Sequence, residues 1–280
     1  MPDDSTAHLL NDGVTLPGIG FGTYPLTGED GIRAMVSALH NGYRYLDSAV
    51  NYQNEEEVGE ALRRSGLPRE EVRLATKVPG RFHAKELALQ SLRDSAKRFG
   101  VERIDVALIH WPNPSRGLYR QAWQALVDAQ GDGLVHTIGV SNFTEEHLLE
   151  VIDDSGVTPA VNQVELHPYF PQTRMRSVHE RLGILTQAWS PLGKNPSPFG
   201  EPPVAAAAKA HDVSPAQVVL RWHVQLGTMP LPKSANPQRQ RDNLDVFGFE
   251  LTDAEVAAIT GLVRTDGRRF GGDPATHEEL

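Results

Sequence analysis

Four residues whose side chains could handle a proton together lie in the first half of the sequence. Asp47, Lys77 and His110 each directly follow a short, mainly apolar run, and Tyr52 comes five residues after Asp47. Aspartate and lysine are rarely fully buried without a partner, so their place at the ends of such runs indicates pairing. We interpret the four residues as one candidate site.

Taken one at a time, each residue also has a simple structural explanation. Asp47 could cap a helix, and Lys77 could lie on the surface. His110 could be a satisfied core histidine, and Tyr52 could simply pack. Ionisable residues at the ends of three successive runs are poorly explained by stability alone, which favours the joint interpretation.

The four side-chain types suit the reduction of a carbonyl compound. That reaction needs a hydride at carbon, which a nicotinamide cofactor supplies, and a proton at oxygen. The pKa of a free tyrosine is about 10, and a neighbouring ammonium lowers it. Lys77 could therefore activate Tyr52 as the proton donor. Asp47 could keep Lys77 charged and oriented, and His110 could position the substrate oxygen.

Apolar runs of this kind alternate with amphipathic stretches along the chain, which indicates parallel strands joined by helices. Eight strands within about 215 residues fit a closed barrel better than an open sheet. We therefore expect one (β/α)8 TIM barrel over residues 1–280, with its active site at the C-terminal ends of the strands. The expected strands are Ile19–Thr23, Tyr43–Asp47, Arg73–Lys77, Asp105–His110, Thr137–Asn142, Ala160–Glu165, Ile184–Ser190 and Met229–Ser234. The expected helices are Gly31–His40, Glu55–Arg64, Lys85–Phe99, Tyr119–Ala129, Glu145–Asp153, Thr173–Leu182 and Pro215–Val224.

Features outside this repeat are also predicted. Asn11-Asp12-Gly13 is typical of a β-hairpin turn, and the hairpin would cover the bottom of the barrel. Val204–His211 and Thr252–Leu262 are expected to be two extra helices, and Gly267–Leu280 a loop. Helix starts are marked by Thr144 and Ser214 as N-caps. Helix ends are marked by Gly42, Gly66, Gly100, Gly156 and Gly183.

Composition excludes several classes of protein. The net charge of −9 argues against a nucleic-acid binder, which needs a basic surface. With no cysteine, disulfides and thiolate metal sites are ruled out. No apolar stretch approaches 18 residues, and Met1–Leu10 does not resemble a signal peptide. We therefore expect a cytoplasmic protein that does not contact membranes.

Several motifs together resemble the aldo-keto reductases, in particular the prokaryotic, 2,5-diketo-gluconate-reductase-like members. They occur in family order along nearly the whole chain. These motifs are Tyr45–Glu55 (YLDSAVNYQNE), Thr76-Lys77-Val78, Leu108–Pro112 (LIHWP), Gly139–Phe143 (GVSNF), Val161-Asn162-Gln163, Ala188–Gly193 (AWSPLG) and Leu231–Ser234 (LPKS).

The resemblance implies that Asp47, Tyr52, Lys77 and His110 form a catalytic tetrad with Tyr52 as the general acid, acting on aldehydes or ketones. It also implies that the protein is a monomer. The cofactor would be NADPH in preference to NADH, because Lys and Arg pair with a 2′-phosphate. Trp189 would stack on the nicotinamide. The other cofactor residues implied are Gly22, Thr23, Ser141, Asn142, Gln163, Ser190, Leu192, Gly193, Lys233, Ser234, Arg239, Asp242 and Asn243.

The substrate pocket is expected to involve Tyr24, Phe82, Trp111 and Phe270. The segment 78–82 departs from the family pattern, since many relatives place an aromatic residue there. The loop 194–203 and the segment after Arg264 are both short. Together with the segment 78–82, they predict an open substrate pocket. The sequence Gly18-Ile19-Gly20-Phe21-Gly22 is not a dinucleotide fingerprint, because its spacing is G-x-G-x-G.

Two other functions stay open at this point. In a metal-dependent barrel hydrolase, Asp47 and His110 would be ligands, although no motif with metal-ligand spacing is present. We accordingly expect no metal. A cofactor-sensing subunit would bind NADPH tightly with little turnover.

Overall fold

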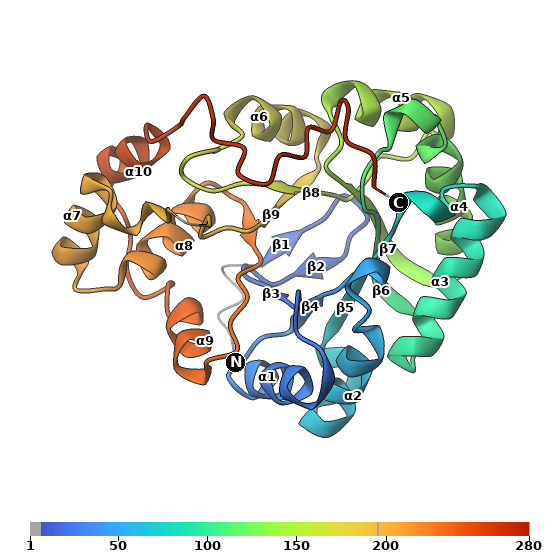
Figure 1. Cartoon of the computed structure of the whole chain (residues 1–280), viewed down its shortest axis with the longest axis horizontal. Helices are drawn as coiled ribbons and strands as arrows, with labels where there is room; N and C mark the ends of the chain where they lie inside the picture. Colours follow the sequence, from blue (N-terminus) through green and yellow to red (C-terminus); the bar gives the residue numbers. More distant parts are fainter. Residues whose placement is uncertain (1–6, 195, 280) are drawn as a thin grey trace.

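The computed structural model describes residues 7–194 and 196–279, and the expectations for the first six residues and Leu280 lie outside it. A parallel eight-stranded sheet in the order β10-β9-β8-β7-β6-β5-β4-β3 forms its centre, with helices outside (Figure 1). All eight expected strands are present, although several are shorter than predicted. They are β3 (Phe21–Gly22), β4 (Tyr45–Asp47), β5 (Arg73–Val78), β6 (Ile104–Ile109), β7 (Val135–Ser141), β8 (Val161–Glu165), β9 (Leu185–Trp189) and β10 (Met229–Pro230).

The sheet closes on itself between its first and last strands. The amide of Gly20 donates to the carbonyl of Pro230 at 3.1 Å, and the amide of Gly22 donates to Pro232 at 3.2 Å. Gly20 permits this approach, because a Cβ there would lie 2.5 Å from Cδ2 of Leu231. The predicted (β/α)8 barrel is confirmed.

The predicted helices are present with small differences at their ends. The first begins at Gly28 instead of the expected Gly31, because Thr27 is already extended and acts as the N-cap. Capping boxes at Thr144 and Ser214 confirm the two predicted helix starts. The helices are α1 (Gly28–His40), α2 (Glu55–Ser65), α3 (Lys85–Phe99), α4 (Tyr119–Gly131), α5 (Glu145–Ser155), α6 (Thr173–Leu182), α7 (Pro202–His211), α8 (Pro215–Gln225), α9 (Pro237–Leu244) and α10 (Asp253–Thr260).

Short 3₁₀ turns join several of these elements. They are η2 (Val50–Tyr52), η3 (Arg69–Glu71), η4 (Gly80–Phe82), η5 (Pro114–Arg116) and η6 (Pro198–Gly200). No helix in the described part of the chain is both long and apolar enough to cross a membrane.

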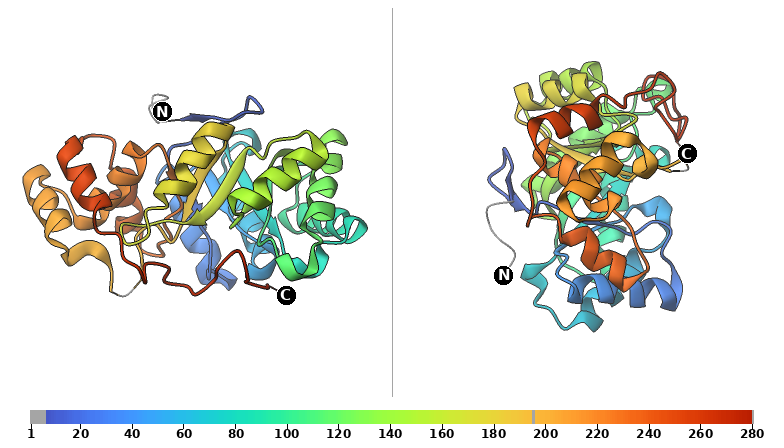
Figure 2. Two further views of the ribbon diagram at one scale, coloured as in Figure 1. Left: turned by 90° about the horizontal axis from the view of Figure 1, so that it is seen from above. Right: turned by 90° about the vertical axis from the view of Figure 1, so that its left-hand side faces the viewer.

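The predicted hairpin covers one end of the barrel. Strands β1 (His8–Leu9) and β2 (Thr15–Leu16) pair antiparallel around the expected turn. Leu10 and Leu16 pack into the barrel interior with Tyr45 and Met229. In Figure 2 the hairpin and the segment that ends at the C-terminus lie on opposite ends of the barrel. The hairpin therefore covers the bottom, and the C-terminal ends of the strands remain available for a site.

The tail segment, residues 265–279, contains no helix or strand, as predicted. It follows α10 and runs across the strand ends toward α4 (Figure 1). The amide of Arg269 donates to Glu165 Oε1 at 2.6 Å, and Phe270 packs edge-on against Trp189, with ring centroids 4.9 Å apart. The segment therefore borders the mouth of the barrel, and the openness of the pocket relative to longer-tailed relatives stays a prediction.

Candidate active site

The C-terminal ends of the strands surround a cavity of about 730 Å³. Asp47 at the end of β4, Tyr52 in η2 and His110 after β6 line it. Lys77 in β5 lies beneath them with no exposed surface. The four residues predicted to act together are therefore within one site, although they come from separate segments.

Lys77 connects the other members of this group. Its Nζ lies 2.7 Å from Oδ2 of Asp47 and 3.4 Å from the hydroxyl of Tyr52, and it also donates to the carbonyl of Ser48 at 2.8 Å. The side chain of Asp47 is only 5% exposed. A buried ammonium is costly unless it is paired and hydrogen-bonded, and both conditions are met here.

The charges of this group follow from burial and proximity. Burial by itself lowers the pKa of Lys77, but Asp47 and Tyr52 more than offset this and raise the pKa above its usual value. Removal from water raises the pKa of Tyr52 above 10, and the ammonium of Lys77 opposes only part of that increase. Lys77 thus acts in the expected direction, but the net pKa of Tyr52 is raised, so the phenol keeps its proton at neutral pH.

Asp47 has a second partner on the opposite side. Gln163 Nε2 donates to Oδ1 of Asp47 at 2.9 Å and to Oε1 of Gln187 at 3.1 Å. Gln187 in turn donates to the hydroxyl of Tyr45 inside the barrel, at 3.1 Å. Both oxygens of Asp47 therefore bind nitrogen donors, which argues against a role for this carboxylate as a metal ligand.

Most residues expected to bind a cofactor line the same cavity. Trp189 Nε1 donates to Oδ1 of Asn142 at 2.8 Å, and Ser141 Oγ donates to the carbonyl of Gln163 at 2.8 Å. These bonds join the ends of β7, β8 and β9. The expected residues that line the cavity are Gly22, Thr23, Ser141, Asn142, Gln163, Trp189, Ser190, Leu192, Gly193 and Lys233.

The backbone is unusual at two of these positions. Asn142 has φ of 62° and Ser190 has φ of 51°, both in the left-handed region that non-glycine residues rarely adopt. Each directly follows a barrel strand. Such conformations cost about 1–3 kcal/mol and gather at functional sites, where the surrounding structure holds them.

The remaining expected cofactor residues are absent from the cavity lining and lie just before α9 or within it. Asn236 caps this helix by accepting from the amides of Gln238 and Arg239. Ser234 is buried beside the cap, and its Oγ accepts from the amide of Asn236 at 3.1 Å. The three other residues expected here are Arg239, Asp242 and Asn243, of which Arg239 is exposed and Asn243 buried.

Three of the four expected substrate residues, Tyr24, Trp111 and Phe270, line the cavity. The ring of Tyr24 is 5.1 Å from that of Tyr52. Phe82 lies apart from the cavity lining and packs against the hydrophobic core outside the barrel, with Arg81 over its ring. The interpretation of Phe82 as a pocket residue is therefore not supported by its position.

Sequence reasoning missed one group beside His110. Glu279 Oε1 in the tail segment lies 2.7 Å from Nδ1 of His110. The side-chain amide of Asn113 donates to the backbone carbonyl of Glu279 and accepts from its backbone amide. Asn113 directly follows the His110-Trp111-Pro112 motif and could have been suspected, whereas an acidic residue in a charged tail carries no such signal.

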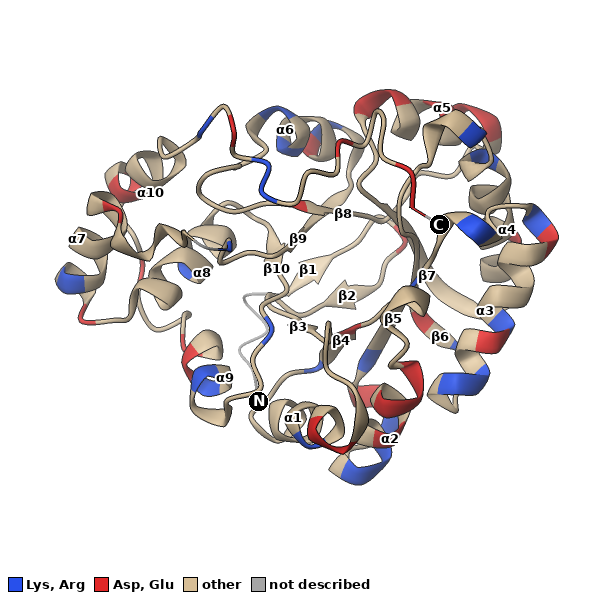
Figure 3. Cartoon of the chain, viewed as in Figure 1, with Lys and Arg blue, Asp and Glu red and all other residues tan. Residues whose placement is uncertain are grey.

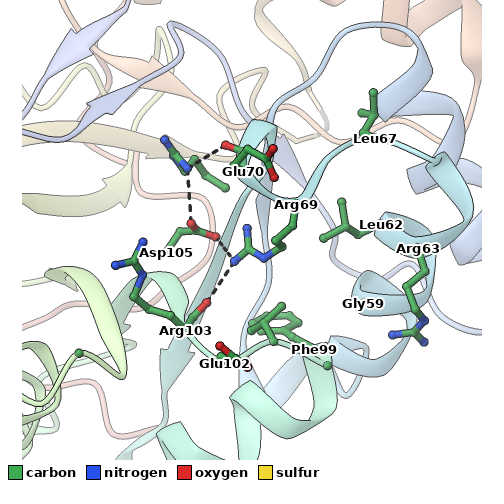
Figure 4. Close-up of a pocket in the computed structure, with 14 residues that line it drawn as sticks. Gly59, Leu62, Arg63, Leu67, Arg69, Glu70, Phe99, Glu102, Arg103 and Asp105 are labelled. Atoms are coloured by element: carbon green, nitrogen blue, oxygen red, sulfur yellow. Dashed lines mark hydrogen bonds and ion pairs between the residues drawn. The ribbon is translucent and has the colours of Figure 1, made fainter.

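A second hollow of similar size, about 760 Å³, lies at the other end of β5 and β6. Figure 4 shows Arg69 reaching Asp105 there, with Nη2 to Oδ2 at 2.6 Å. Arg69 also donates to the carbonyl of Val72 at 2.7 Å, and Arg73 donates to the carbonyl of Glu70 at 3.1 Å. These contacts connect the starts of β5 and β6, which explains them structurally. We therefore take the cavity that Tyr52 lines as the candidate active site.

Comparison with known proteins agrees with this choice. A profile of the Aldo/keto reductase family matches residues 18–196 and 202–264. The 2,5-diketo-D-gluconic acid reductase B of Corynebacterium sp. (strain SHS752001) is 54% identical over 280 residues, the full length of both chains. The morphine 6-dehydrogenase of Pseudomonas putida is 41% identical and covers 95% of this chain and 93% of its own.

Solved structures show the same fold. The structure of a single-residue mutant of Gox0644 in complex with NADPH superposes with a TM-score of 0.92, at 40% identity over 97% of this chain and 98% of that one. The family profile and the full-length relative establish what the motifs and the barrel indicated. This chain belongs to the aldo/keto reductase family of oxidoreductases.

Proposed function

We propose that this protein reduces aldehydes and ketones to alcohols with NADPH, and that Tyr52 is the general acid. The observation that carries the proposal is the buried Asp47–Lys77 ion pair beneath Tyr52, at the floor of a cavity that His110 also lines. An ion pair buried at the C-terminal ends of two barrel strands contributes little to stability, so its position favours a catalytic role.

The fit of a nicotinamide cofactor can be judged from the residues present. Trp189 offers an aromatic face that is partly exposed to the cavity, and Ser141, Asn142 and Gln163 offer hydroxyl and amide groups beside it. These groups suit a flat ring with a carboxamide. When bound, NADPH supplies the hydride that the carbonyl carbon receives.

The residues of the chain then have separate tasks. Tyr52 donates its proton to the carbonyl oxygen, and the raised pKa of the phenol keeps that proton available at neutral pH. Lys77 stabilises the phenolate that remains, because its ammonium lies 3.4 Å from the phenol oxygen. Asp47 keeps Lys77 in place, and His110, whose ring centroid lies 5.8 Å from that of Tyr52, orients the carbonyl oxygen.

The preference for NADPH over NADH rests on the last unit of the barrel. Lys233 lines the cavity and Arg239 lies in the first turn of α9; both are exposed, although the net charge of the chain is −9. Figure 3 shows both basic and acidic residues on α9. The two cations suit the 2′-phosphate, with Ser234 just before α9 and with Asp242 and Asn243 in the last turn of this helix.

The substrate class is a small carbonyl compound. The aromatic side chains of Tyr24, Trp111 and Phe270 border the cavity and suit an aliphatic or sugar-like body. The name of the relative that is 54% identical makes keto sugar acids the first compounds to try. We further propose that the chain forms one domain and acts in the cytoplasm as a monomer. Size-exclusion chromatography with light scattering would measure its molecular mass in solution and so test the monomeric state.

The direct test follows cofactor oxidation at 340 nm with small aldehydes, α-keto aldehydes and keto sugar acids, using NADPH and NADH in parallel. We expect turnover with at least one class, and faster turnover with NADPH at equal low concentrations of the two cofactors. Prior treatment with a metal chelator should leave the rate unchanged. Tight NADPH binding without oxidation by any carbonyl would contradict the proposal and favour a cofactor-sensing role.

A further inference from the structure

The tail segment crosses the active-site end of the barrel and is held at several points. Arg269 is bound by Glu165 at the end of β8, and the ring of His277 lies 4.3 Å from that of Trp111. Gly272 passes so close to Trp111 that a Cβ there would lie 2.5 Å from the indole. These contacts direct the last described residues toward His110.

Asn113 and Gly80 form a specific seat for residue 279. Asn113 is fully buried, and its amide donates to the carbonyl of Glu279 and accepts from the amide of the same residue at 3.3 Å. A Cβ on Gly80 would overlap with this carbonyl and with the Asn113 side chain. The glycine at position 80 therefore leaves room for the tail segment.

This seat directs the carboxylate of Glu279 to His110. Oε1 lies 2.7 Å from Nδ1, and it also accepts from Nδ2 of Asn51 at 2.7 Å. Nδ1 of His110 makes no hydrogen bond within the described residues, and its contact with Glu279 is an ion pair only when the imidazole is protonated. The side chain of Glu279 is 14% exposed and that of His110 is 11% exposed, so both groups are largely removed from water.

The second oxygen of the Glu279 carboxylate is in a different environment from the first. Oε2 of Glu279 is buried and has no hydrogen-bond partner in the described part of the chain. Burial by itself would raise the pKa of Glu279, but contact with His110 and the hydrogen bond from Asn51 bring it below its usual range. A buried carboxylate with one oxygen unpartnered needs a cation nearby, and the imidazole of His110 is the group in contact with it.

We propose that Glu279 is a positioning residue for His110, whose carboxylate holds the Nδ1 side of the imidazole and so turns Nε2 toward the substrate. This inference rests on the proposed role of His110 in binding the carbonyl oxygen. With Nδ1 against a carboxylate, a neutral imidazole would carry its hydrogen on Nδ1 and leave Nε2 without one. Only the imidazolium has a hydrogen on both nitrogens, so only that form can donate from Nε2 to the substrate while it stays paired with Glu279.

Other ionisable groups around His110 act in both directions. Burial lowers the pKa of His83 to about 4, so this neighbour is neutral at physiological pH. The other ionisable groups on the elements around His110 include both acids and bases. These groups are Asp47 on β4, Tyr52 on η2, Lys77 on β5, Arg81 on η4, Arg116 on η5, and His277 and Glu278 in the tail segment.

The test measures the titration of His110 directly by NMR of histidine-labelled protein, with its signal identified by its absence in His110→Gln. An ion pair at this distance shifts a titration midpoint by about 1–3 pH units. We expect Glu279→Gln to lower the midpoint of His110 by that amount, and Glu279→Asp to recover part of the difference. The matched control is Glu278→Gln, because Glu278 also anchors the tail segment, by accepting from the amide of Ser115 at 2.8 Å.

Kinetics provide the second readout. In Glu279→Gln, kcat/KM for carbonyl reduction should begin to fall at a lower pH, in step with the NMR midpoint, while Glu278→Gln, which removes a carboxylate that does not contact Nδ1, should change the profile much less. An unchanged His110 midpoint in Glu279→Gln would overturn the inference, and so would an equal shift in both glutamine variants, since that indicates undocking of the segment. Full turnover in His110→Gln would instead count against the proposed function of His110 itself.

Discussion

The ammonium of Lys77 lies 2.7 Å from Oδ2 of Asp47, and neither side chain has more than 5% of its surface exposed. Removing one member leaves the other buried and unpaired, which typically costs about 3–5 kcal/mol. Lys77→Met should therefore lower the free energy of unfolding by that amount, and Asp47→Leu combined with Lys77→Met should recover most of it. Urea denaturation of the single and double variants gives the comparison. A double variant as unstable as Lys77→Met would show that the pair does not act as a unit.

Cofactor preference should depend on the two exposed cations near α9. Hydrogen bonds to a charged group contribute about 1.5–3 kcal/mol, which is roughly 10- to 150-fold in affinity. Lys233→Ala and Arg239→Ala should weaken NADPH binding by up to this factor and leave NADH binding nearly unchanged. Arg241→Ala is the matched control, because Arg241 is exposed on the same helix and donates to Gln238. Equal losses for both cofactors would count against a 2′-phosphate site.

Stability should fall in mild acid because two buried histidines are held neutral. Burial lowers the pKa of His179 to about 3, and burial likewise lowers the pKa of His223 to about 3, from 6.5. The unfolded chain takes up these protons first, so stability is complete above pH 6.5 and is lost as the pH falls toward 3. Between pH 7 and pH 5 the loss is roughly 2 kcal/mol for each histidine.

The matching variant is His179→Gln, which should remove roughly 2 kcal/mol of that acid-induced loss, although it also destabilises the protein at pH 7. The exposed His40 provides the control in His40→Gln. Urea unfolding at pH 7, 6 and 5 gives the slopes. An identical pH dependence in wild type and His179→Gln would exclude this histidine as a source of the loss.

Closure of the barrel should be sensitive to one added methyl group. A Cβ at Gly20 would lie 2.5 Å from Leu231 and 2.7 Å from the ring of Tyr45, both inside the barrel. Overpacking of this kind costs about 1–3 kcal/mol. Gly20→Ala should lower the unfolding free energy by that amount, whereas Gly200→Ala, which has no atom within 4 Å of the new carbon, should change it little. Equal stability of the two variants would indicate that the first strand can move outward.

Much of this fold could be predicted because the apolar runs and the helix-ending glycines mark the same elements that a (β/α)8 barrel requires. Eight apolar runs separated by amphipathic stretches admit few topologies, and the glycines that end α2, α3, α5 and α6 all have positive φ. Strand lengths were harder to predict. β10 is reduced to Met229–Pro230, because Pro232 lacks the amide that would extend the ladder.

The site was predictable only where its residues follow strands. Asp47, Lys77 and His110 could be placed together because the strand ends of a barrel meet at one face. Glu279 contacts His110 across 169 positions of sequence, and this contact depends on how the tail segment folds back. The net pKa of Tyr52 was equally out of reach, because it depends on how far burial outweighs the effect of Lys77.

The most direct test of the account compares carbonyl reduction by wild type and Tyr52→Phe, with NADPH binding measured by fluorescence in the same samples. Replacing a general acid removes about 10²–10⁴ of the rate. We predict a loss of that size in turnover with NADPH affinity unchanged, because the substitution deletes the hydroxyl and keeps the ring. Turnover equal to wild type in Tyr52→Phe would contradict the assignment of Tyr52 as the proton donor.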